Sequence, residues 1–558
     1  MSEPGSLSRT TGPVTAWREY RFVLIFGIIA LAITSIPYVV GATMATEERV
    51  FGGFVYATSD CYSYLAKMRQ GAEGAWLFHL PYTPEPHPGT PFFLLHLMLG
   101  KIAALLPGGN LTSRMVCVYH AARWFFGLGL LMMIYRFLAL LTGQIRVRRL
   151  AWLMTTFGGG LGWILIALGR PTWLGSLPLD VILPEGFTFL VLYAFPHIAL
   201  ARTFLLGGFL ALLGVWRTGT TNGERAQSAT RGWRSGTALA GLAWLAMGLV
   251  VPFYVAVAWA VTGAAWITLT LRRHRLCWQE IRAAVVAGLI SSPAVIFSVW
   301  RFTTDTTYAT WAAQNQILSP HPFHYVAAYG LPLALALSAA RDSWKSDELT
   351  WLAWAWVAVV PILIYSPFNL QRRLVEGVQV PLSLLAAVGV VRITNTTSSA
   401  KPLRRTLVVG AILIALLPTN AMLVAGNTLS LRPRPHPVFR DQGEIAALCW
   451  LSPRVGPADV VLTSYETGNY LPARAGSRAF VGHGPETVHA DEKRALVATF
   501  FKATTEDGWR QDLLEAYDID YVFWGPLERT LGNFAPRTVP YLREVHRVGD
   551  YTIFTVEL

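Results

Sequence analysis

The chain has 558 residues, of which 53% are hydrophobic and only 14% are charged. A soluble protein carries about 25% charged residues, so the composition excludes an ordinary soluble enzyme and indicates an integral membrane protein. In a soluble chain the formal net charge of +13 would suggest nucleic-acid binding. Here the basic residues lie mostly in short loops between apolar segments, which is typical of topology signals. We therefore expect the lipid bilayer as a partner and no nucleic acid.

Apolar runs of about 17 residues or more predict membrane-spanning helices. The first run, at 22–40, is too long for a cleavable signal peptide, so we expect it to remain as a helix. A later run is too long for one crossing, and Pro252 divides it into two spans because proline suits a tight turn. The sequence predicts a polytopic α-helical protein of about 11 spans. These spans lie near 22–42, 115–142, 150–169, 187–216, 236–251, 253–271, 282–300, 323–340, 350–366, 376–393 and 406–426.

The apolar segment Pro91–Leu106 resembles a further span, but we interpret it as a helix that lies in the membrane interface. Every interior loop is then basic, as the positive-inside rule requires. The N-terminus is cytoplasmic in this arrangement, and the C-terminal tail is extracytoplasmic. The sequence therefore predicts a multi-pass protein of the cell membrane, with outer loops at 43–114, 170–186, 301–322 and 367–375.

The chain changes in character after the last predicted span. We expect a transmembrane domain at 1–430, whose first outer loop at 43–114 carries interfacial helices, and a stiff proline-rich linker at 431–440. Residues 441–558 alternate between strand-like and helical patterns, which predicts a small extracytoplasmic α/β domain. Its strands are expected at 459–463, 520–524 and 551–556, and its helices at 492–502 and 509–517.

Asp60 is the first candidate for chemistry, because it lies in the first outer loop at the start of a helical pattern. One interpretation is an N-cap, in which its carboxylate accepts hydrogen bonds from the first turn of the helix. Ser59 can serve as that cap equally well, and Tyr62 and Tyr64 give Asp60 a polar, aromatic surrounding. The other interpretation is a carboxylate that works as a catalytic base at the membrane surface.

The same loop is rich in groups that bind substrates or metals. His79, Glu85 and His87 are candidates for lining a substrate cavity or for holding a divalent metal ion. Their spacing matches no metal-binding motif, so both interpretations stay open and no metal ligand is assigned.

Two adjacent arginines, Arg372 and Arg373, lie in the last outer loop, where basic residues are disfavoured. Such a pair can extend to lipid headgroups at the interface. Guanidinium groups also match phosphoryl oxygens, so the pair is a candidate clamp for the phosphate of a donor. Glu376 is close enough along a helix to pair with the arginines instead.

The predicted span 187–216 is long and contains Pro196, which predicts a broken helix. A broken helix exposes backbone groups and is tolerated beside a cavity or inside protein. His197 and Arg202 are therefore candidates for cavity residues, and a kink with a core histidine is an equal alternative.

Two further loops are candidates for contacts with substrate. Asp305 lies in the outer loop 301–322 among aromatic and amide side chains, which suits sugar binding as well as an interfacial aromatic belt. The segment Gly482–Thr487 follows a strand in the tail and can reach a substrate, although turn chemistry explains its glycines equally well.

The arrangement resembles the GT-C superfamily of membrane glycosyltransferases, which use sugars carried on polyprenyl phosphate. The resemblance consists of a long first outer loop that begins near an acidic residue, many further spans and an outer C-terminal domain. At the level of motifs it rests on Asp60 with Tyr62 and Tyr64, and on the pair Arg372-Arg373. Many members carry two adjacent acidic residues where this chain has Ser59-Asp60.

The resemblance implies transfer of a sugar from a polyprenyl-phosphate donor to an acceptor at the outer membrane face. Asp60 then acts as the base, Arg372 and Arg373 stabilise the departing phosphate, and a single displacement inverts the anomeric carbon. The acceptor is a glycan, a lipid or a protein, and a divalent metal remains an open cofactor. The alternatives are a lipid or glycolipid transporter or flippase, and a membrane assembly protein without catalytic activity.

Overall fold

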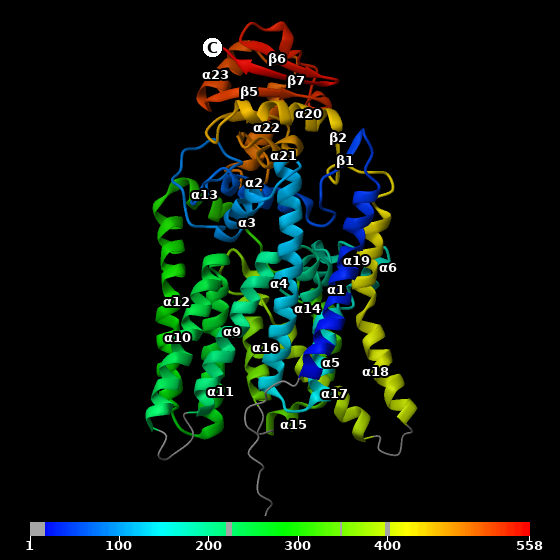
Figure 1. Ribbon diagram of the computed structural model, residues 1–558, viewed down its shortest axis with the longest axis vertical. Coiled ribbons are helices and arrows are strands. Elements are labelled where there is room, and N and C mark those ends of the chain that lie inside the picture. Colours follow the sequence, from blue (N-terminus) through cyan, green and yellow to red (C-terminus); the bar gives the residue numbers. More distant parts are fainter. Residues whose placement is uncertain (1–16, 219–225, 346–348, 397–401) are drawn as a thin grey trace, which may run out of the picture. The chain divides into compact units, whose positions relative to one another are not determined.

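Long helices dominate the computed structural model, which describes residues 17–218, 226–345, 349–396 and 402–558 (Figure 1). The chain divides into two compact units. Unit 1 comprises the described residues of Met1–Thr34, Trp124–Val295 and Leu318–Leu423, and unit 2 comprises Ser35–Arg123, Ile296–Ile317 and Val424–Leu558.

Six helices in the described part of the chain are long and apolar enough to cross a membrane. The bent pair α18 and α19, which turns by 44° between Leu407–Leu416 and Pro418–Leu429, makes a seventh if it counts as one span. The chain is therefore a multi-pass membrane protein, but the predicted number of about 11 spans is not confirmed. The six are α1 (Trp17–Thr43), α4 (Leu111–Leu141), α5 with α6 (Ile145–Ala167), α9 (Pro196–Arg217), α11 (Tyr254–Arg273) and α12 (Trp278–Thr304).

The other predicted spans also coincide with helices, and most of these helices are short. At a rise of 1.5 Å per residue, helices of 15 to 18 residues measure about 22–27 Å, less than the hydrocarbon core of about 30 Å. A count of apolar runs in the sequence does not separate such helices from full spans. They are α10 (Ala226–Val250), α14 (Phe323–Ser338), α16 (Thr350–Ile364) and α17 (Gln379–Thr396).

Proline divides the helices where the sequence predicted breaks. Helix α8 (Thr188–Ala194) ends before Phe195, and α9 begins at Pro196. Helix α10 ends at Val250, and α11 begins at Tyr254, on the far side of Pro252. Proline suits the first position of a helix because it has no N–H group to leave unpaired there. Both predicted breaks are confirmed.

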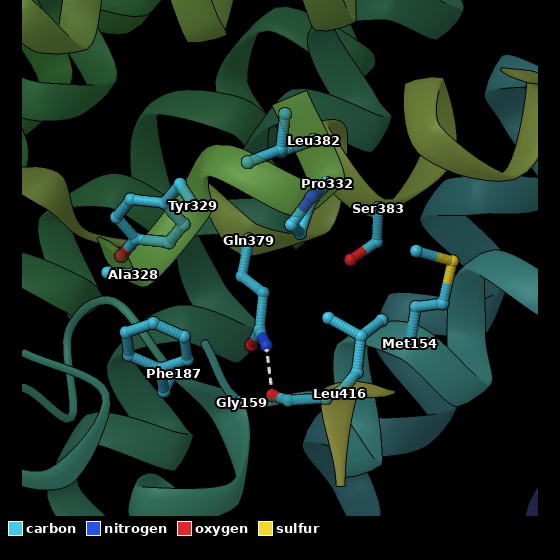
Figure 2. A pocket seen from close by; sticks show the side chains of 11 residues that line it. Met154, Gly159, Phe187, Ala328, Tyr329, Pro332, Gln379, Leu382, Ser383 and Leu416 are labelled. Carbon is cyan, nitrogen blue, oxygen red and sulfur yellow. Dashed lines mark hydrogen bonds between the residues drawn. The ribbon is translucent and has the colours of Figure 1, made fainter. Parts of the chain in front are cut away.

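Two breaks meet inside unit 1 and satisfy each other's backbone groups. Gly159, between α5 and α6, donates its N–H to the carbonyl of Leu416 at 2.7 Å, and Gln379 donates to the carbonyl of Gly158 at 2.7 Å. Buried backbone groups need such partners when no water is present. The cavity beside Gln379 has a volume of about 10 Å³ (Figure 2), which holds one water molecule at most. It is therefore too small for a sugar or a lipid.

Unit 2 contains a five-stranded sheet of order β4-β3-β5-β7-β6. Figure 1 labels three of these strands, β5, β6 and β7. β3 is parallel to β4 and β5, whereas β7 is antiparallel to β5 and β6. The predicted strands and helices of the tail are all present, so the α/β prediction is confirmed. The strands are β3 (Val460–Leu462), β4 (Arg478–Ala479), β5 (Ile519–Trp524), β6 (Leu542–Val548) and β7 (Tyr551–Val556). The helices are α20 (Gln442–Leu451), α21 (Tyr465–Ala475), α22 (Ala490–Phe500), α23 (Asp507–Ala516) and α24 (Pro526–Arg529).

Buried apolar side chains from the sheet and from α22 form the core of this part of unit 2. Phe480, Phe500, Val522 and Phe554 are completely buried and pack in one cluster. Helix α21 makes the crossover that parallel strands β3 and β4 require, because a tight hairpin cannot join parallel neighbours.

Residues 43–114, the predicted first outer loop, belong to unit 2 together with the tail. β1 (Arg49–Phe51) pairs antiparallel with β2 (Phe439–Asp441), which lies almost 400 residues later in the chain. This grouping differs from the predicted boundaries, which placed the loop in the domain 1–430 and made 431–440 a separate linker. The linker instead ends in a strand, because the backbone of β1 offers it a partner.

Two helices of the first loop pack against each other in unit 2. They are α2 (Thr58–Ala72) and α3 (Leu94–Leu105), and α3 corresponds to the segment that we interpret as interfacial. Its 12 residues measure about 18 Å, too little to cross a bilayer. Its position at the membrane surface stays a prediction.

Parts of the predicted interior loops, at 219–225, 346–348 and 397–401, lie outside the described residues, as do residues 1–16. The predicted cytoplasmic N-terminus and the extracytoplasmic tail depend on these loops, and they stay predictions.

Candidate active site

Helix α2 carries Asp60 in its first turn, and its buried face explains why it folds there. Cys61, Leu65 and Met68 recur at helical spacing and are fully buried. The N-cap position is Ala57, in the left-handed region with φ of 47°, and Asp60 is the third residue of the helix. The N-cap interpretation of Asp60 is therefore wrong. Its side chain is 48% exposed, so the carboxylate is accessible to a reactant.

His483 holds this carboxylate from the loop that connects β4 to α22. Its Nε2 donates to Asp60 Oδ1 at 2.9 Å, while its Nδ1 lies 3.4 Å from Glu486 Oε1. Glu486 in turn accepts from Lys67 Nζ at 2.6 Å. Lys67 follows Asp60 by two helical turns, so the two side chains share one face of α2, about 10 Å apart along its axis. His483 and Glu486 bridge that gap.

These four side chains alternate in charge. Burial alone lowers the pKa of His483, but its hydrogen bonds with Asp60 and Glu486 and their negative charges raise it to about 9. Burial alone raises the pKa of Glu486, but the Lys67 and His483 cations lower it to about 2. Near neutral pH the order from the buried end is therefore cation, anion, cation and then the half-exposed Asp60 anion. We call these four residues the charge chain.

The loop that carries His483 is fixed at several points. Gln314, at the end of α13 (Thr306–Gln314), donates to the carbonyl of Thr487 at 2.5 Å. Gly484 donates its N–H to the hydroxyl of Tyr465 at 2.9 Å, and Val488 donates its N–H to Thr83 Oγ1 at 3.3 Å. These contacts order the loop before any substrate arrives.

Gly482 of this loop and Gly468 of α21 (Tyr465–Ala475) allow close packing. A Cβ on Gly482 would lie 2.5 Å from the Tyr82 ring and 2.7 Å from the Gly468 carbonyl. A Cβ on Gly468 would lie 1.9 Å from the Val481 carbonyl. Neither glycine has a positive φ, so close packing and not a left-handed backbone explains glycine at these two positions.

Most other predicted residues of unit 2 have structural partners. Tyr62 is completely buried and donates to the carbonyl of Pro437 at 2.8 Å, which fixes α2 beside β2. Tyr64 is half-buried and stacks on His96 with ring centroids 4.7 Å apart. Glu85 forms an ion pair with Lys493 at 2.6 Å. These three side chains pack and tie the loop rather than line an open cavity.

The remaining histidines and Asp305 of unit 2 have similar explanations. Both ring nitrogens of His87 are occupied, by the Leu80 N–H at 2.8 Å and by the Glu85 carbonyl at 2.7 Å. Burial lowers the pKa of His87 to about 4, so the ring is neutral. His79 is half-buried and lies 5.8 Å from the His87 ring. Asp305 accepts from the Tyr308 N–H at 3.1 Å and is the N-cap of α13, and its contact with a sugar stays a prediction.

The candidates of unit 1 centre on a buried ion pair. Arg202 is completely buried, with its Nε 2.5 Å from Glu376 Oε1, and it also donates to the carbonyls of Pro184 and Glu185. It is a structural clamp, not a cavity residue. Glu376 therefore pairs with Arg202 and not with Arg372 or Arg373, the partners that the sequence suggested.

The arginine pair lies in the 3₁₀ segment η2 (Gln371–Val375), just before Glu376. Arg373 Nε lies 3.6 Å from Glu185 Oε1, at a side chain that is 40% exposed. Arg372 is half-buried, and its Nε has no hydrogen-bond partner among the described residues. His197, in the first turn of α9, packs edge-on against Phe195 at 6.0 Å. Among the described residues, Arg372 Nε thus keeps donor capacity for an anion, whereas Arg373 is paired with Glu185.

The sequence did not identify His483 and Glu486 as partners of Asp60. The two residues stand more than 400 positions after Asp60, in a loop whose composition is ordinary for a turn. The one available signal in the sequence was a histidine and a glutamate in a short segment that also contains two glycines.

No family model matches the chain, and no curated protein matches it. Solved structures do. In its apo form, the oligosaccharyltransferase of Archaeoglobus fulgidus is similar with a TM-score of 0.54 at 12% identity, over 91% of this chain and 70% of that chain.

Two further structures from the same organism are also similar. The oligosaccharyltransferase AglB in complex with an inhibitory peptide and a dolichol-phosphate gives a TM-score of 0.52 at 12% identity, over 91% and 70% of the two chains. The enzyme tethered to an acceptor peptide with an NVT sequon gives 0.53 at 11% identity, over 91% and 69%. The chain therefore shares the fold of these oligosaccharyltransferase structures. The prediction of a multi-pass helical protein with a small sheet region at its C-terminal end is confirmed at that level.

Proposed function

We propose that the protein is a glycosyltransferase that moves a sugar from a polyprenyl-phosphate donor to an acceptor, with Asp60 as the base. The observation that carries the proposal is a half-exposed carboxylate, fixed by a buried charge chain, on a chain with the GT-C fold.

The chemistry is a single displacement. The acceptor hydroxyl gives its proton to Asp60 while its oxygen forms a bond to the anomeric carbon. The bond from that carbon to the phosphate oxygen breaks, and the polyprenyl phosphate departs with the electron pair. Attack opposite the leaving group inverts the anomeric configuration, and a well-placed base contributes about 10²–10⁴-fold to the rate.

Arg372 and Arg373 are the proposed ligands of the donor phosphate. Arg202 and not this pair takes the Glu376 carboxylate, and Arg372 Nε has no hydrogen-bond partner among the described residues. The Arg373 side chain is 40% exposed, so its charge is accessible to an anion. Negative charge grows on the phosphate as it leaves, and positioned cations stabilise it. The reaction is proposed at the outer membrane face. The lipid-linked and peptide ligands of the oligosaccharyltransferase structures support a lipid-linked donor and make a polypeptide one acceptor to test beside glycans and lipids.

The test uses the purified full chain in proteoliposomes, a polyprenyl-phosphate donor with a radiolabelled sugar, and a panel of glycan, lipid and peptide acceptors. Asp60→Asn removes the base with little change in shape and is expected to lower transfer by about 10²–10⁴-fold. Asp491→Asn is the matched control, because that side chain is 99% exposed in the same unit. Unchanged transfer in the Asp60 variant would remove the base assignment.

The same vesicles separate the alternative functions. A lipid transporter would move labelled lipid across the bilayer without any acceptor. Its lipid flux would be the same in Asp60→Asn, and neither form would transfer sugar to an acceptor. A membrane assembly protein would show neither reaction.

A further inference from the structure

We propose that the imidazolium of His483, rather than a bound divalent metal ion, is the cation that faces Asp60 during sugar transfer. The inference deepens the proposed function and rests on it. His483 is a positioning residue in this proposal: it acts through Asp60 and does not touch the reacting atoms.

The first support is the geometry around the carboxylate. His483 Nε2 lies 2.9 Å from Asp60 Oδ1, so an N–H donor occupies the side of the carboxylate that a metal ion would share. Glu486 lies on the other side of the ring and is held by Lys67 at 2.6 Å. Both Lys67 and Glu486 are almost completely buried, which fixes this order of charges.

The second support is the chemistry of the donor set. A metal ion needs lone pairs, and a protonated imidazole has none on its ring nitrogens. The negative groups on both sides raise the pKa of His483 to about 9, so the protonated form is present at neutral pH. Glu486 shares its charge with two cations and cannot bind a third without losing one of them. Among the described residues, no group of three or more histidine, cysteine, aspartate or glutamate side chains is arranged to hold a metal ion.

The cation has a definite task beside the base. It holds a positive charge against the carboxylate, with His483 Nε2 2.9 Å from Asp60 Oδ1. It also fixes one carboxylate oxygen, so that the remaining accessible part meets the acceptor hydroxyl. The proton of His483 stays on His483 throughout, and Asp60 alone receives the proton of the acceptor.

Several titratable groups face His483 and enter any pH profile. Asp60 and Lys67 come from α2, Glu486 from the same loop, and Tyr82 from the first outer loop with its ring 5.8 Å away. Tyr465, at the start of α21, binds the next residue of the loop. Burial raises the pKa of Tyr82 well above its ordinary value, so Tyr82 stays neutral across the profile.

The first arm of the test concerns metal. Full-length protein in proteoliposomes is treated with EDTA, and transfer is measured before and after addition of Mg²⁺ or Mn²⁺. Mn²⁺ binding to the untreated protein is measured in parallel by calorimetry. We expect transfer within about twofold of the untreated rate and no stoichiometric Mn²⁺ binding that Asp60→Asn abolishes. Loss of transfer in EDTA with recovery in Mn²⁺ would overturn the proposal.

The second arm concerns the cation. In the natural protein, loss of the His483 proton should lower the rate as the pH rises through about 9. His483→Gln keeps a hydrogen-bond donor but has no proton to lose, so this alkaline limb should be absent from its pH–rate profile. A merely structural role would lower the rate and leave the limb in place, which would also overturn the proposal. If the variant does not fold, the metal arm on the natural protein decides alone. Failure of the proposed function is distinct, because it appears as unchanged transfer in Asp60→Asn.

Discussion

Removal of Glu486 should loosen the loop that carries His483 far more than removal of Lys67, although the two residues form one ion pair. Glu486→Gln leaves the Lys67 ammonium, which is 0% exposed, without an anion. Lys67→Met leaves Glu486 still paired with His483, whose Nδ1 lies 3.4 Å away. The two substitutions therefore differ in whether a buried charge is left unpaired.

The magnitudes follow from that difference. An unpaired buried charge costs about 3–5 kcal/mol of stability. Lys67 can instead lose its proton, which for an ordinary lysine at pH 7 costs about 4–5 kcal/mol, so the penalty cannot exceed that amount. The Phe93 ring, 4.3 Å from Lys67 Nζ, offsets about 0.5–1 kcal/mol of it. We therefore expect about 3 kcal/mol for Glu486→Gln. Methionine fills the site of Lys67 with an apolar chain of similar size, so Lys67→Met should cost about 1 kcal/mol.

Native-state hydrogen exchange in nanodiscs measures the opening of this loop directly. The amides of Glu486 and Thr487 both donate to the carbonyl of His483 at 2.9 Å and report on loop opening. Since about 1.4 kcal/mol is a factor of ten, their exchange should accelerate by about 150-fold in Glu486→Gln and about fivefold in Lys67→Met.

The control and the refuting result are both specific. Glu492→Gln removes an exposed carboxylate on α22, six residues from Glu486, and should leave exchange unchanged. Equal acceleration in Lys67→Met and Glu486→Gln, or greater acceleration in Lys67→Met, would show that the anion is not shared between two cations.

Two more predictions concern pH and the buried pair of unit 1. Because the folded-state pKa of His483 lies above its usual value of 6.5, its stabilisation is complete below about pH 6.5 and is lost as the pH rises through about 9. The shift corresponds to about 3 kcal/mol, so exchange-rate protection of the loop, corrected for intrinsic rates, should fall across that window and stay constant between pH 5 and pH 6.5. In unit 1, Arg202→Met leaves the buried Glu376 carboxylate unpaired and should lower stability by about 3–5 kcal/mol, measured by thermal unfolding in detergent. The double variant Arg202→Met with Glu376→Gln should recover most of that loss, and an equal or larger loss would contradict a paired charge.

Local sequence patterns were sufficient to predict most helices and strands, and to predict that Asp60 lies at the start of a helix. Apolar runs of the sequence coincide with helices because burial of a continuous apolar surface fixes where a helix lies. Pro196 and Pro252 predicted the two breaks, since proline lacks the N–H group that a continuing helix needs. The strands at 460–462, 519–524 and 551–556 followed from their short apolar runs. The number of full spans did not follow, because apolar composition does not report the length over which a helix stays straight.

The candidate site was decided by tertiary structure. Asp60 and Lys67 are seven residues apart and their shared helix face is readable from the sequence. Their bridge, His483 and Glu486, comes from a loop more than 400 residues later, and no local pattern encodes that contact. The same holds for Arg202 with Glu376, which the sequence placed in separate candidate sites. Sequence by itself determined which residues can carry charge at a membrane surface, whereas the fold decided which charges are buried together, because the energy of a buried charge depends on its neighbours in space.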